Sequence, residues 1–347
     1  MKDICIVGFG LAGLSIARHA ELSGLSFDVV TDASQKSSRI AGGILNPIAI
    51  KRMKPVWKAE YFLDYAKDFY KKLSIDLNYE LLQDHYIYSF IHNVEQENNW
   101  YEALDKPRIK PFASQQIFSN TSLPFLNTKK YGLIKASIVN LEKLFELASR
   151  HYNQEKSMRF EKFSFIDLEI SSGYVKYQDK KYSHIIFCEG FGVTQNSYFN
   201  NLGIYGNKGD YLIIQSEELN LWHIAKARYF LIPLGNHNYK FGATYQRQPL
   251  THTPSKEAQK QMVEALEKMI NVPYKIVDQV CGIRPTTKDR RPILGTHEQF
   301  KRLHILNGFG SRGVMMSPRL GSELLEYIFN NKPLNKEVSI DRIYAQT

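Results

Sequence analysis

The sequence predicts an α/β fold (α+β overall), in which a parallel sheet covered by helices is joined to a second, mostly antiparallel sheet. Three observations lead to this prediction. Residues 4–32 run from an apolar strand through a glycine-rich turn into a helix and a second strand. Two later apolar strands, which begin at His184 and Leu303, also end in glycine-rich junctions. Between residues 79 and 131, short strand-like pieces alternate with polar turns.

The first stretch has the pattern of a dinucleotide-binding unit. Its apolar run, 4–7, is followed by three glycines with the spacing G-x-G-x-x-G and then by apolar residues at helical spacing. Gly8 permits the tight turn, Gly10 lets the backbone approach a pyrophosphate, and Gly13 lets helix and strand pack closely. Asp32 closes the second strand 19 positions after Gly13, where a carboxylate can accept from a ribose hydroxyl. We therefore expect a bound dinucleotide; the alternative is a glycine-rich turn in an unrelated α/β protein.

The next segment predicts an irregular loop that another group approaches closely. Gly42 and Gly43 are adjacent and shortly precede Pro47. From 55 to 73, large apolar residues recur every four positions, which predicts a core-facing helix. Between the loop and this helix lies a short basic cluster: Lys51, Arg52 and Lys54.

The rest of the chain predicts further strands and helices in two groups. Helices are expected at 141–148, 255–270 and 320–329, and strands at 206–215, 228–233, 239–245 and 276–283. We expect residues 1–78, 132–199 and 281–347 to form a discontinuous, Rossmann-like nucleotide-binding domain. We expect residues 79–131 and 200–280 to form a substrate-binding domain built on a mostly antiparallel sheet.

Composition is that of an ordinary globular protein with an excess of basic residues. Of 347 residues, 43% are apolar and 23% charged, and the formal net charge is +10. The cations could bind an anionic partner such as nucleic acid, or they could belong to a solvated basic surface. The three cysteines are far apart and predict neither a disulfide framework nor a metal site. No apolar run predicts a membrane span or a cleaved signal, so we expect a cytoplasmic protein without a membrane partner.

Several separated blocks resemble one family. Taken with the glycine motifs, their order resembles the D-amino-acid oxidase (DAO) superfamily of FAD-dependent oxidoreductases, which includes glycine and sarcosine oxidases. Residues 287–295 and the Gly-Phe-Gly-Ser-Arg-Gly run at 308–313 look most like the oxidoreductase domain that processes the carboxymethylaminomethyl group of wobble uridine in tRNA. Residues 41–45 look instead like the small-amine oxidases. The blocks are 7–13 with Asp32, 38–47, 187–190, 229–244, 282–295 and 307–318.

The resemblance implies noncovalent FAD, because no cysteine occupies the position that would attach the flavin. Gly8, Gly10, Gly13 and Asp32 would hold the ADP half of the cofactor. Arg39, Gly42 and Gly43 would line the pyrophosphate and the flavin edge, with Gly190 as a further contact. Gly308, Gly310, Arg312 and Gly313 would approach the N1/O2 side of the isoalloxazine, where N–H groups stabilise reduced flavin.

The resemblance also implies two catalytic residues. Arg284 would grip a substrate carboxylate, because a planar two-pronged cation fixes both its direction and its distance; the alternative is a surface ion pair. Lys240 would be a cation that activates oxygen, or else a plain strand lysine. Tyr229 and Tyr245 could close the pocket.

The function implied is oxidation of the C–N bond of an amino acid or N-substituted glycine, by hydride transfer to flavin N5. The alternative keeps this chemistry and places the substrate on tRNA, so that the carboxymethyl group of carboxymethylaminomethyl-uridine is removed by oxidation. A third reading is a flavoprotein without turnover. The partner expected is thus a small amine or amino acid, or tRNA in the alternative.

Overall fold

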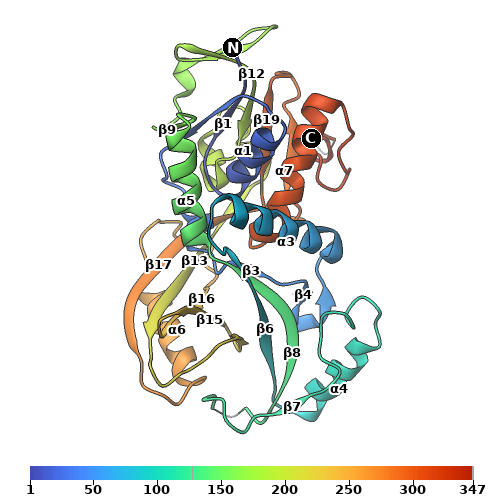
Figure 1. The fold of residues 1–347 in the computed structure, drawn as a ribbon, viewed down its shortest axis with the longest axis vertical. Coiled ribbons are helices and arrows are strands. Elements are labelled where there is room, and N and C mark those ends of the chain that lie inside the picture. Colours follow the sequence, from blue (N-terminus) through green and yellow to red (C-terminus); the bar gives the residue numbers. More distant parts are fainter. Residues whose placement is uncertain (127, 346–347) are drawn as a thin grey trace.

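Two sheets lie end to end in the computed structural model, which describes residues 1–126 and 128–345. Helices α1 (Leu11–Leu22), α5 (Leu141–Gln154) and α7 (Gly313–Asn330) lie over the first sheet, and both chain ends lie in this half (Figure 1). Helix α3 (Ala59–Asp76) crosses the middle of the molecule. None of the helices in the described ranges has the combination of length and hydrophobicity needed to cross a bilayer.

The first sheet is built around three parallel strands, β1 (Lys2–Val7), β2 (Phe27–Thr31) and β12 (Lys180–Phe187). Their central residues are buried on both faces, as expected for strands covered by helices on either side. Because parallel strands end at the same edge, the residues that follow Val7, Thr31 and Phe187 meet there. The other strands of this sheet are β9 (Met158–Phe160), β10 (Leu168–Ile170), β11 (Val175–Tyr177), β18 (Ile293–Thr296) and β19 (Leu303–Asn307).

A buried carboxylate ties the three central strands together. Asp28 on β2 has a fully buried side chain, and it accepts from Lys2 Nζ at 2.7 Å on β1. It also accepts from Lys180 Nζ at 3.2 Å and from Tyr182 Oη at 2.7 Å, both on β12. Burial raises the pKa of Asp28, whereas the three donors lower it. The donors outweigh burial, so the pKa lies below its ordinary value and the carboxylate stays ionised.

Within the described residues, the second sheet has nine strands and is antiparallel except where β14 runs beside β6. Its longest pairing joins β13 (Tyr205–Gln215) to β17 (Lys275–Thr286), which extends up to the first sheet. A Cβ on Gly282 of β17 would lie 2.9 Å from the Cα of Ser37, so the backbones touch there. The other strands are β3 (Ile44–Leu45), β6 (Leu82–Ile91), β7 (Phe118–Ser119), β8 (Lys130–Val139), β14 (Ile224–Lys226), β15 (Phe230–Gly235) and β16 (Asn238–Gly242).

The remaining elements are short. Polar side chains cap three of the helices: Asn93 accepts from Gln96 N, Asn140 from Lys143 N, and Ser255 from Ala258 N. Other helices are α2 (Ser37–Ile40), α4 (Val94–Leu104), α6 (Lys256–Glu267) and α8 (Asp341–Tyr344); β4 (Ile48–Ala49) pairs with β5 (Lys54–Pro55); 3₁₀ turns span Ile50–Arg52, Phe165–Asp167 and Gly190–Gln195.

The expected elements and the observed ones differ in a few places. The helix α4 lies inside the stretch for which only strands and turns were expected. The helix expected from residue 55 begins at Ala59, after Lys58 in a left-handed conformation. The strands β3 and β8 belong to the second sheet, although the expected boundaries place almost all of their residues in the nucleotide-binding domain. The domain boundaries themselves stay a prediction.

Candidate functional site

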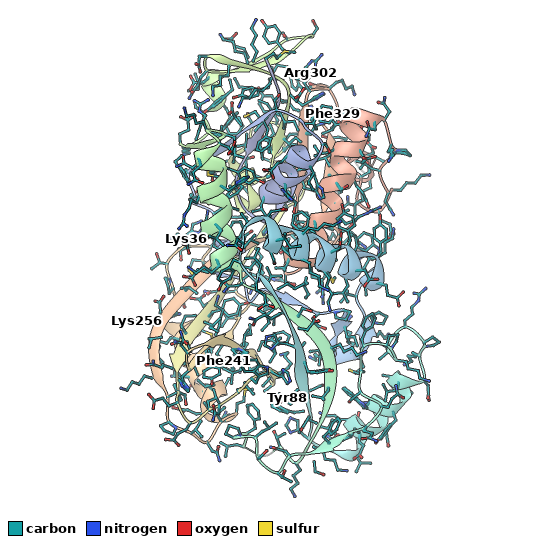
Figure 2. All side chains as sticks on the ribbon, viewed as in Figure 1. Lys36, Tyr88, Phe241, Lys256, Arg302 and Phe329 are labelled. Atoms are coloured by element: carbon teal, nitrogen blue, oxygen red, sulfur yellow. The ribbon has the colours of Figure 1, made fainter. Side chains whose placement is uncertain are left out.

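A cavity of about 950 Å³ lies where the two sheets meet. Its wall contains the β1–α1 turn, the ends of β2 and β12, parts of segment 33–52, strands of the second sheet and the N-terminus of α7. Figure 2 shows Lys36, which belongs to that segment, at the level between the two halves. A cavity of this volume is large enough for a cofactor or a drug-sized ligand.

The β1–α1 turn brings bare backbone to the wall. Gly8 has φ +97°, and a Cβ on it would lie 2.6 Å from the carbonyl oxygen of Cys188. A Cβ on Gly10 would lie 2.8 Å from Ser38 Oγ, which accepts from the first N–H of α1, that of Leu11, at 3.1 Å. Gly13 is not in the wall: its Cβ would lie 2.0 Å from the carbonyl oxygen of Gly8, so it serves helix–strand packing.

Two carboxylates stand at this edge of the first sheet. Asp32 lines the cavity and accepts from Ser34 N at 2.9 Å. Glu189 follows β12, and its Cα would lie 3.2 Å from a Cβ on Gly8. Burial raises the pKa of Glu189 to about 7, with Asp32 adding to the rise and a 2.6 Å bond from Asn196 Nδ2 opposing it. No sequence pattern singles out Glu189, because its position becomes meaningful only once β12 pairs with β1.

The expected flavin-edge residues also lie in the wall. The Arg39 guanidinium stands 4.8 Å from the centre of the Phe145 ring, and burial lowers its pKa. Gly42 and Gly43 line the cavity. Gly43 has φ +68°, and its Cβ would lie 2.1 Å from the carbonyl oxygen of Val139, so only glycine fits there.

The loop before α7 and the turn after β12 reach the cavity as well. Gly310, Arg312 and Gly313 line it, and Arg312 Nη1 donates to the carbonyl of Asn46 at 3.1 Å. Gly190 lines it with φ +58°. Gly308 is absent from the wall. With φ +77° and a Cβ position 2.8 Å from Thr287 Cγ2, it shapes the loop rather than facing a ligand.

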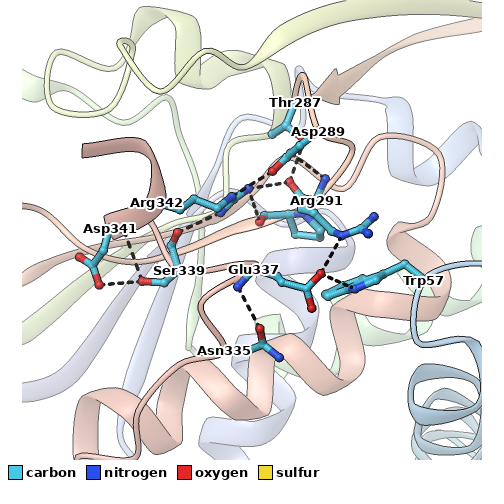
Figure 3. Close-up of polar contacts among 10 residues, drawn as sticks. Trp57, Thr287, Asp289, Arg291, Asn335, Glu337, Ser339, Asp341 and Arg342 are labelled. Carbon is cyan, nitrogen blue, oxygen red and sulfur yellow. Dashed lines mark hydrogen bonds and ion pairs between the residues drawn. The ribbon is translucent and has the colours of Figure 1, made fainter. Parts of the chain in front are cut away.

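The loop 287–291 is fixed from behind by the C-terminal segment (Figure 3). Arg342 Nε donates to Asp289 Oδ2 at 3.1 Å, and Arg342 Nη2 donates to the Arg291 carbonyl at 3.1 Å. Glu337 accepts from Trp57 Nε1 at 3.0 Å and lies 3.7 Å from Arg291 Nε. Arg290 stands between these anchored residues with φ +59°, and its side chain lines the cavity.

Arg284 of β17 lies in the cavity wall with neutral partners. Its Nη1 donates to Asn207 Oδ1 at 3.1 Å and to the Thr244 carbonyl at 3.3 Å. Its guanidinium lies 4.6 Å from the centre of the exposed Tyr245 ring. Among the described residues no carboxylate forms an ion pair with Arg284, so the surface ion pair considered for it is not observed.

Lys240 points elsewhere. It does not line the cavity, and its Nζ donates to the carbonyls of Ile40 and Ala41, at 3.2 and 3.4 Å. Burial lowers its pKa. A different lysine, Lys226 at the end of β14, is in the wall; its Nζ donates to the next two carbonyls at 2.7 and 2.8 Å, and burial lowers its pKa to about 8. The catalytic role expected of Lys240 stays a prediction, and the geometry does not favour it.

The wall is strongly cationic. Asp32 and Glu189 are the carboxylates in it, against nine cations, and none of the nine forms an ion pair within the described part of the chain. Such a surface attracts anions through its summed field. The cations are Arg39, Lys51, Arg52, Lys162, Lys226, Arg228, Arg284, Arg290 and Arg312.

The chain is similar to known proteins in sequence and in fold. Residues 165–327 match the family model described as DAO, FAD dependent oxidoreductase. The curated glycine oxidase of Bacillus subtilis (strain 168) is 23% identical over 265 residues, which cover 71% of this chain and 65% of that protein. The chain thus matches just under two thirds of the length of that relative.

Solved structures share the fold. The glycine oxidase of Bacillus cereus ATCC 14579 superposes with a TM-score of 0.78 at 16% identity, covering 96% of each chain. The iminodiacetate oxidase of Chelativorans sp. BNC1 gives 0.75 at 17% identity, covering 98% of each chain. The predicted fold class is therefore confirmed.

Proposed function

We propose that this chain, whose residues 165–327 match the model of the DAO family of FAD-dependent oxidoreductases, oxidises the C–N bond of an amino acid or an N-substituted glycine. The observation that carries the proposal is Arg284, a cavity cation held by neutral groups and so available to a substrate carboxylate. A carboxylate can accept two parallel bonds from one guanidinium, which fixes its orientation.

The residues present fit FAD. The N-terminus of α1 and its glycine turn offer backbone N–H groups to a pyrophosphate, and Asp32 stands where a ribose hydroxyl would bind. The N-terminus of α7, with Gly310 and Arg312, would supply positive potential to the flavin end. Bound FAD would supply the hydride acceptor, its N5 atom.

This chain's own residues would bind and orient the substrate. Arg284 would hold the carboxylate, and the Tyr245 ring beside it would cover the pair and exclude water. Fixing the carboxylate restricts where the amine-bearing carbon can lie, which is the main contribution positioning makes to rate.

The experiment is anaerobic mixing of the FAD-loaded protein with glycine and with sarcosine, read as loss of flavin absorbance. We expect bleaching by at least one of them, and at least tenfold lower kcat/KM in Arg284→Ala, equivalent to about 1.4 kcal/mol. Arg247→Ala, at an exposed arginine two residues after Tyr245, should behave as wild type. Flavin that stays oxidised with both amines would contradict the small-substrate proposal.

A second candidate places the N-substituted glycine on tRNA. The observation that favours it is the cationic wall, in which Lys51 and Arg52 are exposed at the surface. Polyanion binding releases counterions, so affinity for tRNA should fall steeply with added salt. Unchanged affinity between low and moderate salt, or equal affinity in Lys51→Glu/Arg52→Glu, would remove this candidate.

A further inference from the structure

The strand β13 presents three side-chain positions to Arg284. Side chains alternate along a strand, so Asn207, Gly209 and Tyr211 share one face. Asn207 is the direct cross-strand partner of Arg284 on β17. The side chain of Arg284 therefore runs along this face of β13, from Asn207 over Gly209.

Gly209 is the surface on which the guanidinium rests. A Cβ at this position would lie 2.2 Å from Arg284 Nη2, 2.4 Å from Nη1 and 2.5 Å from Cζ. Distances this short mean that any side chain at 209 would displace the whole guanidinium. The centre of the Tyr245 ring lies 4.6 Å from Arg284 Cζ, so the cation contacts an aromatic ring as well as the glycine.

Asn207 supplies orientation without supplying charge. Its Oδ1 and the Thr244 carbonyl both accept from Nη1, which is one of three nitrogens in a group with five donors. The neighbouring Tyr211 adds no charge either, because burial raises the pKa of its phenol. Arg284 is thus held through Nη1 and by the neutral phenol of Tyr211, while its positive charge stays uncompensated.

We propose that Asn207 is a specificity-determining residue, and that with Gly209 it positions Arg284 so that the cavity selects a substrate bearing a carboxylate. An aspartate at 207 would stand in ion-pair distance of Arg284 and would occupy the charge that a substrate needs. The inference rests on the proposed function for its substrate class, but the arrangement of the anion subsite can be tested without turnover.

The test uses non-reacting probes on the FAD-loaded protein. Acetate carries the carboxylate and acetamide is its neutral, nearly isosteric counterpart; binding of each is followed by the change in flavin absorbance. We expect Asn207→Asp to weaken acetate binding at least tenfold and to leave acetamide binding unchanged. Gly209→Ala should also weaken acetate binding at least tenfold, because it moves Arg284.

Matched controls separate positioning from general damage. Asn200→Asp adds the same charge at an exposed residue, and Gly173→Ala adds a methyl group where nothing lies within 4 Å; both should bind acetate as wild type. Asn207→Ser keeps a neutral acceptor and should retain most of the acetate affinity. With glycine as substrate, Asn207→Asp should raise KM far more than it lowers kcat, whereas glycinamide should not show this split.

Several results would overturn the proposal. These are acetate affinity unchanged in Asn207→Asp, equal losses in Asn207→Ser and Asn207→Asp, or a wild type that does not bind acetate. Failure of the proposed reaction looks different: glycine and sarcosine would not bleach the wild-type flavin, while acetate binding would still depend on Asn207 and Arg284.

Discussion

Glu189 is expected to make the free energy of unfolding depend on pH in an unusual direction. Its pKa is about 7 in the folded protein, against an ordinary 4.5 in an unfolded chain. Between these values the folded protein holds a proton that the unfolded chain has released. Raising the pH through this window therefore lowers stability, and above pH 7 the full cost of the buried charge is present.

The size of the effect follows from the same two values. The difference corresponds to at most about 3 kcal/mol, and water in the cavity would screen part of it. Glu189→Gln removes the charge, so the FAD-free variant should equal wild type near pH 4.5 and become more stable, by up to about 3 kcal/mol, at pH 7 and above.

The assay is urea unfolding of both FAD-free proteins at several pH values between 5 and 8. Buried histidines act in the opposite direction: burial lowers the pKa of His184 to about 4, so its contribution is lost as pH falls from 6.5. The histidine contribution is the same in both proteins, so it cancels when the free energy of unfolding of wild type is subtracted from that of the variant. Glu217→Gln, at an exposed glutamate, should give no difference. A Glu189→Gln difference that is constant with pH would refute the reasoning.

Three further outcomes are expected. Gly13→Ala should lower the free energy of unfolding by about 1–3 kcal/mol and abolish FAD binding, measured by flavin fluorescence, because its methyl group would overlap the Gly8 carbonyl. Asp28→Asn should lower the free energy of unfolding in urea by about 1.5–3 kcal/mol, because the charge-assisted bonds from Lys2 and Lys180 are lost; a change within error would show that these bonds contribute little to stability. Lys240→Met should leave the rate at which oxygen reoxidises the reduced protein unchanged, because the ammonium group is bonded to backbone carbonyls. A tenfold slower rate in stopped flow would support the oxygen-activating role expected from the sequence.

The local parts of the fold could be predicted because their constraints are local. Gly8 has a positive φ, and a Cβ on Gly13 would overlap the carbonyl oxygen of Gly8 only five residues earlier, so both positions favour glycine for reasons within the same turn. The prediction that every fourth residue of α3 faces the core was less accurate. Four residues advance about 40° beyond one helical turn, so the buried face moves away from Tyr61, which is exposed, and onto neighbours such as Phe62 and Tyr70.

What was missed depends on contacts between distant segments. The helix α4 buries few residues, and its Trp100 packs where Gly132 of β8 leaves room, which no local pattern reveals. Glu189 and Lys226 matter because the fold places them in a cavity wall. The expected role of Lys240 came from a family resemblance. A resemblance does not reveal that the ammonium group donates to the carbonyls of Ile40 and Ala41.

The contact between α1 and α7 has a consequence for biosynthesis. Ser15 and Ser317 bond across 302 positions of sequence, and β1 pairs with β12 at Lys2 and Tyr182. At the usual speed of translation, the ribosome needs about 15 to 60 s to make the residues between Ser15 and Ser317. The helix α1 must wait that long for α7, whereas β1 can pair with β2 early and waits only until residue 187 for β12. We expect the nascent chain to need protection from aggregation and to acquire its cofactor only at the end of synthesis.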